Sequence, residues 1–181
     1  DAFTPSASKS YYAIWISDLD QGNSSDYASV FSLNAGSVDN NYGWRGTTGS
    51  NGGKLWHETR TTNYTHNALG KTYGIGIAVL PNNSTVAQQQ YLNALASTTT
   101  MAARDLRIAP GLSVIGNSNT NASTDDYFFG KVQEIIVLSK SSPGQTLSAS
   151  ELQVINSYLA TKYGITLNTA SQPNYVFSNG A

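Results

Sequence analysis

With 181 residues and a formal net charge of −1, the chain lacks the basic surface on which binding to nucleic acids or anionic membranes depends. It has no cysteine, which excludes disulfides and thiolate metal sites, and no apolar stretch long enough for membrane insertion. Only 12% of the residues are charged and 39% are hydrophobic, so we expect a single domain over residues 1–181 with a neutral polar surface. A start at Asp1 without methionine suggests a processed chain or a fragment of a larger protein.

The N-terminal half of the sequence predicts a series of strands joined by polar loops. Aromatic and β-branched residues fill 11–16, and apolar residues alternate with polar ones over 27–33 and 54–62. Residues 73–80 form an apolar run that predicts a central strand, in which two glycines indicate close approach of another backbone.

Two segments after this run have mixed signals. Residues 88–95 lie between turn signals and predict a strand, although their alanine and glutamine content also favours a helix. Residues 106–115 contain proline and glycine, and they predict irregular chain or an edge strand.

The segment 127–138 reads YFFGKVQEIIVL and is almost continuously apolar. Such a run is typical of a strand that is buried on both faces, and we expect it to lie inside a sheet. A bulge at Gly130 is the alternative interpretation of its central glycine.

A change of period after this run predicts one α-helix over about residues 148–163. Ser148 and Glu151 have the spacing of a capping box, and Gly164 follows where a left-handed residue ends many helices. Many strands followed by one late helix indicate an all-β fold. We predict a two-sheet antiparallel sandwich around one core, with the helix across an edge or an open end.

The C-terminal part of the sequence resembles a known family. Its signature is the segment 127–138, then LSASE at 147–151, then YLATKYGITL at 158–167. Together these resemble the C-terminal half of the laminin G-like, concanavalin A-like jelly-roll modules of large bacterial surface and secreted proteins. The resemblance implies a jelly-roll sandwich, adhesion or binding of carbohydrate or peptide, sometimes with calcium, and a secreted or cell-surface location beside neighbouring domains of the same polypeptide.

Two features depart from the family pattern. The family pattern has another strand or two before Phe3, and Tyr91-Leu92-Asn93-Ala94 stands where it has Tyr-Leu-Asn-Gly. The first difference suggests a fragment boundary or an edge strand supplied by other sequence, and the second puts the turn after Asn93 in question.

Two polar loops carry oxygen ligands of the kind that calcium prefers. In residues 18–26 such ligands stand at every second position, and residues 117–126 alternate amides and end in paired carboxylates. An ordinary solvated loop is the alternative in each case. The candidate ligands are Asp18, Asp20 and Asp26 in the first loop and Asn117, Asn119, Asp125 and Asp126 in the second.

Aromatic residues in and beyond the glycine-rich stretch that follows residue 34 are candidate ligand-binding groups. Exposed rings in loops would stack on sugar rings or grip a peptide. The alternative is that Trp44 and Trp56 fill the interior of the sandwich. The candidates are Tyr42, Trp44, Arg45, Trp56 and Tyr64.

Signals of catalysis are absent from the sequence. A retaining glycosidase on this kind of fold needs two carboxylates on one strand face, but Glu58, Glu134 and Glu151 are isolated from one another. No Gly-x-Ser-x-Gly motif occurs, and the lone His57 and His66 predict structural or exposed roles. We therefore expect a protein that is not an enzyme.

Taken with the resemblance, these observations predict a non-catalytic ligand-binding or adhesion module of a bacterial extracellular protein. Its ligand would be a neutral glycan or a peptide, with calcium as the candidate cofactor. Two alternatives stay open: a structural spacer without a ligand, and a polysaccharide-cleaving enzyme on the same fold.

Overall fold

The structure is a computed structural model that describes residues 6, 8–19, 28–35, 41–44, 54–59, 62–66, 73–99, 101–104, 112–116, 127–168 and 175. Within these residues, no helix has the length and apolarity that crossing a membrane requires.

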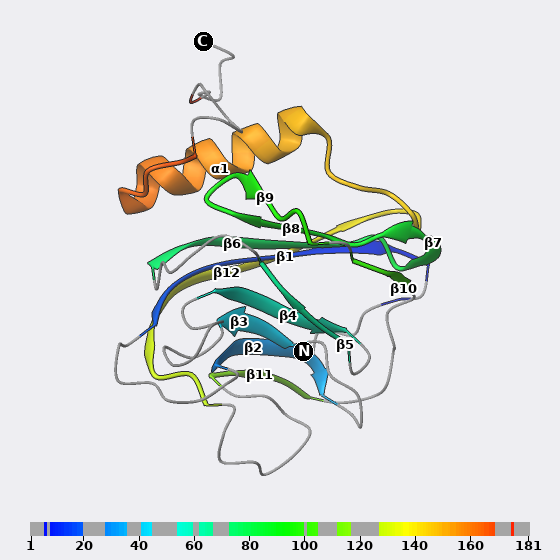
Figure 1. The fold of residues 1–181 in the computed structure, drawn as a ribbon, viewed down its shortest axis with the longest axis horizontal. Helices are drawn as coiled ribbons and strands as arrows, with labels where there is room; N and C mark the ends of the chain where they lie inside the picture. The colour runs from blue at the N-terminus through cyan, green and yellow to red at the C-terminus, as the bar shows by residue number, and fades with distance from the viewer. Residues whose placement is uncertain are drawn as a thin grey trace.

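The described chain forms two antiparallel sheets and one helix in three layers (Figure 1). The helix-covered sheet has the order β12-β1-β6-β8-β9. Its strands are β1 (Ser10–Leu19), β6 (Tyr73–Leu80), β8 (Gln89–Leu92), β9 (Leu95–Ala96) and β12 (Gly130–Lys140). The second sheet has the order β11-β2-β3-β4-β5. Its strands are β2 (Ala28–Ala35), β3 (Asn41–Trp44), β4 (Leu55–Thr59), β5 (Thr62–Thr65) and β11 (Leu112–Ile115).

A short pair formed by β7 (Asn83–Ala87) and β10 (Ala103–Arg104) completes the strands of the described chain, and α1 (Ala149–Tyr163) is its helix. The prediction of an all-β, antiparallel jelly-roll sandwich with one C-terminal helix is confirmed. Strands were also correctly expected at 88–95 and at the end of 106–115, where β11 lies at an edge of the second sheet.

Two hydrophobic cores, rather than the single core that we predicted, lie on the two faces of the helix-covered sheet. The inner core fills the space between the sheets and includes Trp15 and Trp44. The outer core lies between the sheet and α1, where Ile14, Ile77 and Leu159 are fully buried. The expected position of the helix, across an edge or open end, is therefore wrong: α1 covers the outer face of the sheet (Figure 1). The physical reason is that β1 and β6 are apolar on both faces, so the outer face also needs a cover.

Strand β12 differs most from its prediction. Among the described strands it lies at the edge of the helix-covered sheet, beside β1, and its side chains are exposed or half-buried. The expectation of a strand buried on both faces inside a sheet is wrong, because an apolar pattern reports neither how many neighbours a strand has nor which ones. The alternative prediction was a bulge at Gly130. The pairing register between β12 and β1 instead shifts at Gln133, since Ile16 pairs with Glu134 and Ser17 with Val132.

Three glycines of the helix-covered sheet leave room for close neighbours. A Cβ on Gly130 would lie 2.1 Å from the carbonyl oxygen of Asp18, so this glycine allows the backbone of β1 to approach. Gly74 and Gly76 instead make room for side chains, those of Asn93 and Trp15 respectively. The prediction that another backbone approaches these two glycines of β6 is therefore wrong, because side chains pack against them instead.

The structure forms a turn directly after β8, at the position where the sequence has alanine after Asn93. Asn93 and Ala94 both adopt positive φ, of 48° and 70°, and they join β8 to β9. Oδ1 of Asn93 accepts a hydrogen bond from the backbone amide of Ile75 at 2.8 Å, and the backbone amide of Asn93 donates to the Ile75 carbonyl at 3.0 Å. These bonds fix the turn on β6, with alanine at the position where the laminin G-like pattern that the sequence resembles has glycine.

The ends of α1 are as predicted. Glu151 donates its amide to Ser148 Oγ at 3.2 Å, and the Glu151 carboxylate accepts from the Ser148 amide at 2.8 Å, which is a complete capping box. At the other end Gly164 has φ of 65°, and the amide of Ile165 donates to the Ala160 carbonyl at 2.9 Å. Ile165 then returns into the outer core.

Candidate functional site

The aromatic candidates that the structure describes are core residues. Tyr42 and Trp44 lie on β3 and Trp56 on β4, and all three are at most 1% exposed. The prediction that these rings are exposed in loops is therefore wrong, and the alternative, that the tryptophans fill the sandwich, is what the structure shows. Arg45 lies outside the described residues, as does the side chain of Tyr64, whose backbone belongs to β5.

Contacts within the inner core explain this burial. The Trp44 indole donates to Ser17 Oγ at 2.7 Å, so its one polar atom is satisfied inside the sandwich. The Tyr42 ring stacks on Phe31 with centroids 4.8 Å apart. Burial raises the pKa of the Tyr42 hydroxyl far above its usual range, so that it stays neutral. These side chains support the fold and offer no ring face to a ligand.

Of the seven candidate calcium ligands, the structure describes Asp18. It stands near the end of β1, opposite Tyr73 of β6 and Lys131 of β12 in the register. The other six, in the two polar loops, lie outside the described residues. Among the residues that the structure describes, no group of three or more histidine, aspartate or glutamate side chains could hold a metal ion.

Two exposed aromatic rings lie on the segment that leads into β12. Tyr127 is 40% exposed and Phe129 is 58% exposed, whereas Phe128 between them packs against the inner core. Alternation along an extended chain explains the difference, because neighbouring side chains point to opposite sides. Neither ring was among the predicted site residues, because the apolar run around them predicts a strand buried on both faces. The alternation around Phe128 is the signal that could have identified them.

This aromatic segment is fixed to the second sheet. The amide of Phe128 donates to the Gly116 carbonyl at 3.0 Å, and Tyr127 forms a parallel bridge with Ser29 of β2. Ile115, at the end of β11, is 71% exposed close to this bond. Tyr127 directly follows residues 117–126, the second polar loop of the sequence analysis.

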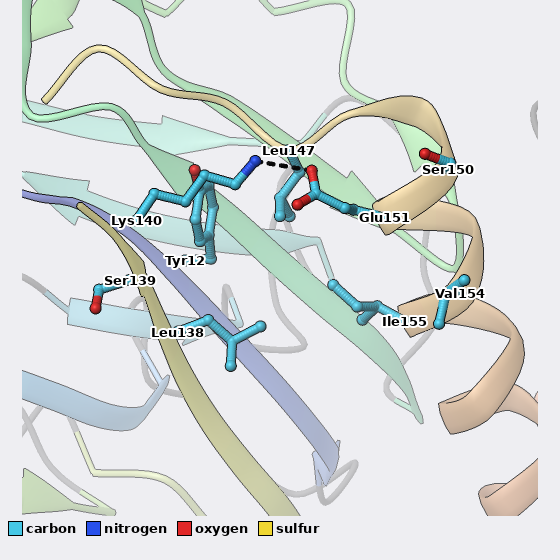
Figure 2. Close-up of a pocket in the computed structure, with 9 residues that line it drawn as sticks. All are labelled: Tyr12, Leu138, Ser139, Lys140, Leu147, Ser150, Glu151, Val154 and Ile155. Atoms are coloured by element: carbon cyan, nitrogen blue, oxygen red, sulfur yellow. Dashed lines mark hydrogen bonds and ion pairs between the residues drawn. The ribbon is translucent and has the colours of Figure 1, made fainter. Parts of the chain in front are cut away.

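A pocket of about 480 Å³ lies between the first turns of α1 and the end of β12 (Figure 2). Figure 2 shows Leu138 of β12 and the helix residues Val154 and Ile155 projecting toward this space from opposite sides. Tyr12 and Leu147 line it as well, so its walls are mainly apolar.

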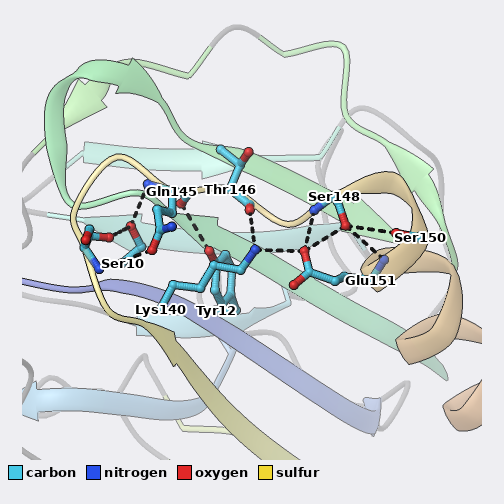
Figure 3. A network of polar contacts seen from close by, with 9 residues as sticks. Ser10, Tyr12, Lys140, Gln145, Thr146, Ser148, Ser150 and Glu151 are labelled. Atoms are coloured by element: carbon cyan, nitrogen blue, oxygen red, sulfur yellow. Dashed lines mark hydrogen bonds and ion pairs between the residues drawn. The ribbon is translucent and has the colours of Figure 1, made fainter.

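Hydrogen bonds around Lys140 and Glu151 frame one end of the pocket (Figure 3). The Lys140 ammonium donates to Glu151 Oε2 at 2.8 Å and to the Thr146 carbonyl at 3.0 Å. The hydrogen bond from Lys140 and those from Ser148 lower the pKa of Glu151 to about 2, so the carboxylate is charged at neutral pH. Tyr12 Oη donates to the Gln145 carbonyl at 3.1 Å, and burial together with the charge of Glu151 raises its pKa to about 12.

A second ion pair joins the other end of α1 to β12. The Lys162 ammonium lies 3.2 Å from Glu134 Oε2, and the Tyr163 hydroxyl donates to the same oxygen at 2.9 Å. Between the two ion pairs the helix carries Val154 and Tyr158, which are 51% and 55% exposed. The side of α1 above β12 is therefore apolar in the middle and charged at both ends.

The two lone histidines are buried, as their structural interpretation predicted. His57 Nε2 lies 2.9 Å from Gln88 Oε1 inside the sandwich, and burial lowers the pKa of His57 to about 4. His66 Nε2 lies 2.9 Å from the Leu95 carbonyl oxygen, and burial lowers its pKa too.

Comparisons with known proteins support the fold. A family profile described as "Domain of unknown function (DUF8202)" matches residues 151–181. A solved structure of a native heptameric SAP-like pentraxin from Limulus polyphemus aligns with a TM-score of 0.54 and 10% identity, over 82% of this chain and 71% of that chain. At such identity the likeness concerns the sandwich fold alone.

Domain 4 of AbnA, a GH43 extracellular arabinanase from Geobacillus stearothermophilus, solved in complex with arabinotriose, aligns with a TM-score of 0.44 and 12% identity. The alignment covers 80% of this chain and 65% of that chain, less than two thirds of its length. A search of curated proteins finds no match.

Proposed function

We propose that the chain is a non-catalytic binding module of a secreted or cell-surface bacterial protein, and that it presents Tyr127 and Phe129 to a neutral glycan. The observation that carries the proposal is the exposure of these two rings on a segment that the core holds in place. Large apolar groups exposed together on a protein surface often mark an interaction site.

The chemistry of the segment suits a sugar. The C–H face of a sugar ring is apolar and packs on an aromatic ring, while its hydroxyls need hydrogen-bond partners. Residues 117–126, which directly precede Tyr127, supply amide, hydroxyl and carboxylate groups. Calcium held by these carboxylates is part of the proposal, because the ion would coordinate ligand hydroxyls as well.

Rigidity supports the same role. Phe128 is anchored in the inner core and its amide is bonded to Gly116, so the two rings on either side need little ordering when a ligand binds. Preorganised aromatic groups give affinity at a low entropic cost.

The non-catalytic part of the proposal rests on the carboxylates. Glu134 is paired with Lys162, and Glu151 is bonded to Lys140 and to the helix cap. Both groups therefore have structural partners, whereas glycoside hydrolysis needs two carboxylates that act on the substrate.

A glycan array tests the proposal, with peptides included because a peptide was the other expected ligand. The wild-type chain should bind a neutral glycan, and Tyr127→Ala and Phe129→Ala should each weaken that binding about tenfold or more, as loss of an aromatic anchor does. Tyr158→Ala is the matched control, since it removes an exposed tyrosine from α1, and it should bind as the wild type does. Assays with calcium and with chelator separate the calcium requirement from the glycan.

Two results would contradict this function. If no glycan binds with or without calcium, the structural spacer becomes the better interpretation. If a glycan binds equally well to both aromatic variants, the ligand site lies elsewhere on the chain.

A further inference from the structure

We propose that two copies of this chain associate through antiparallel pairing of their β12 edges, centred on Val137. Among the described strands, β12 is outermost in the helix-covered sheet and pairs along one side with β1. Its irregularity is at Gln133, and residues 134–140 keep an unbroken register with β1. A regular, apolar edge strand is a template for a further strand.

The register shows which side chains share a face. Ile136 and Leu138 stand opposite Ile14 and Tyr12, which belong to the outer core, so they point to the helix side of the sheet. Glu134 and Lys140, two residues further out in each direction, lie on the same side. Along the strand, the side chains on the helix side are thus acidic, apolar, apolar and basic in that order.

This order is complementary to itself. When two such strands run antiparallel with their Val137 residues opposite, Glu134 of one copy faces Lys140 of the second copy, and the reverse pair forms at the other end. Ile136 faces Leu138 of the second copy in the middle. Cross-strand pairs of opposite charge and of apolar side chains both favour association. Charge complementarity therefore identifies a second copy as the occupant of this edge.

The helix layer strengthens the match. In each copy Lys140 is paired with Glu151 at 2.8 Å and Glu134 with Lys162 at 3.2 Å. In the dimer the charges would run Glu151, Lys140, then Glu134 and Lys162 of the second copy, with the sign alternating at each step. Every charge would then neighbour only opposite charges, and the two-fold axis repeats the arrangement.

The apolar surface between these charges would also be covered. Val154 and Tyr158 are more than half exposed above β12, and the pocket opens between Leu138 and Val154 (Figure 2). A second copy would bring the same side of its own helix to this place. The exposed apolar middle of each helix would then lie against its equivalent, which explains why it is not polar.

Cysteine crosslinking tests the pairing, and it is simple because the chain contains no cysteine. A cysteine at the centre of the pairing stands opposite the same cysteine of the second copy, at a separation that a disulfide can span. Val137→Cys should therefore form a disulfide-linked dimer in mild oxidant. Val132→Cys, on the same strand but away from the centre, is the control and should stay largely uncrosslinked.

Charge variants test the register. Glu134→Lys and Lys140→Glu should each weaken self-association about tenfold or more, because two attractive cross-strand pairs become repulsive. An equimolar mixture of these two variants should form a heterodimer, since each then meets its opposite charge at both ends. Lys131→Glu reverses a charge outside the pairing and should associate as the wild type does. Circular dichroism confirms that each variant is folded.

Analytical ultracentrifugation of the wild-type chain from micromolar to millimolar concentration gives the decisive result. A monomer throughout this range overturns the proposal, even if a peptide binds to the same edge. The pairing is also overturned if the chain dimerises but the Val137→Cys variant forms no disulfide in oxidant. It is overturned as well if the mixture of the two charge variants stays monomeric.

Discussion

A Cβ on Gly76 would lie 2.4 Å from Cε2 of Trp15, so the glycine of β6 and the indole of β1 fill complementary space in the inner core. The two residues stand directly opposite one another in the register. The same Cβ would lie 2.6 Å from Cδ1 of Leu55, which reaches this place from the second sheet. Gly76 is thus the point where the two sheets come together around a tryptophan.

Gly76→Ala should therefore destabilise the fold by about 1–3 kcal/mol, the usual cost of overpacking a filled core. Urea unfolding followed by tryptophan fluorescence measures the change. Trp15→Phe in the same chain should recover part of the loss, because the smaller ring makes room for the new methyl group. Simple additivity of the two substitutions would show that the residues do not compete for space.

The turn at Asn93 gives a second prediction. Asn93→Ala should cost about 2–3 kcal/mol, because it leaves the buried amide of Ile75 without its acceptor and places alanine at positive φ. Asn93→Gly removes the same acceptor but tolerates the backbone conformation, so it should cost less. Chemical denaturation compares the two variants. Equal losses would mean that backbone conformation contributes nothing here.

Stability should depend on pH through His57. Its pKa falls from 6.5 to about 4 on burial, so the unfolded chain takes up the proton at a higher pH than the folded protein does. The stabilisation is fully present above pH 6.5 and is lost as the pH falls toward about 4, by an amount on the order of 3 kcal/mol.

Unfolding free energies measured in urea between pH 7 and pH 4 check this dependence. His57→Gln should flatten the curve, and His66→Gln should flatten it too, because burial lowers the pKa of His66 in the same direction. A His57→Gln curve that is as steep as the wild-type curve would show that other groups control acid unfolding.

Local features of the sequence were the most predictable. The capping box of Ser148 and Glu151 and the left-handed Gly164 depend on residues within one or two turns, and the structure has them as predicted. The place of α1 was not predictable in the same way. It follows from the burial of Ile14 and Ile77 on the outer face, which depends on strands distant in the sequence.

Exposure was the least predictable property, because it depends on the number of neighbours. The aromatic residues Trp44 and Trp56 stand beside a glycine-rich stretch that looks like a loop, yet both lie on strands and are buried. Conversely, Phe129 belongs to a run that reads as a buried strand and is exposed, because Phe128 faces the core and its neighbour points to the opposite side. A prediction from hydrophobicity alone therefore assigned the buried tryptophans to the surface and the exposed Phe129 to the core.

The helix cap gives the last prediction, which separates capping from ion pairing. Ser148→Ala removes the acceptor for the Glu151 amide and should cost about 1 kcal/mol, the usual value for a lost cap. Glu151→Gln keeps an oxygen for the Ser148 amide but loses the charge that pairs with Lys140. Because the Glu151 side chain is 43% exposed, this pair is screened by solvent, and its loss should cost less than the cap.

Salt and pH distinguish the two contributions. The cost of Glu151→Gln should shrink as the salt concentration rises, whereas the cost of Ser148→Ala should not, since it removes a hydrogen bond rather than a charge. The pKa of Glu151 is lowered to about 2, so its contribution is present above its ordinary pKa and is lost as the pH falls toward 2. Thermal melts of both variants at low and high salt measure this difference. Equal sensitivity to salt would mean that Ser148 acts on the helix chiefly by holding the Glu151 carboxylate beside Lys140.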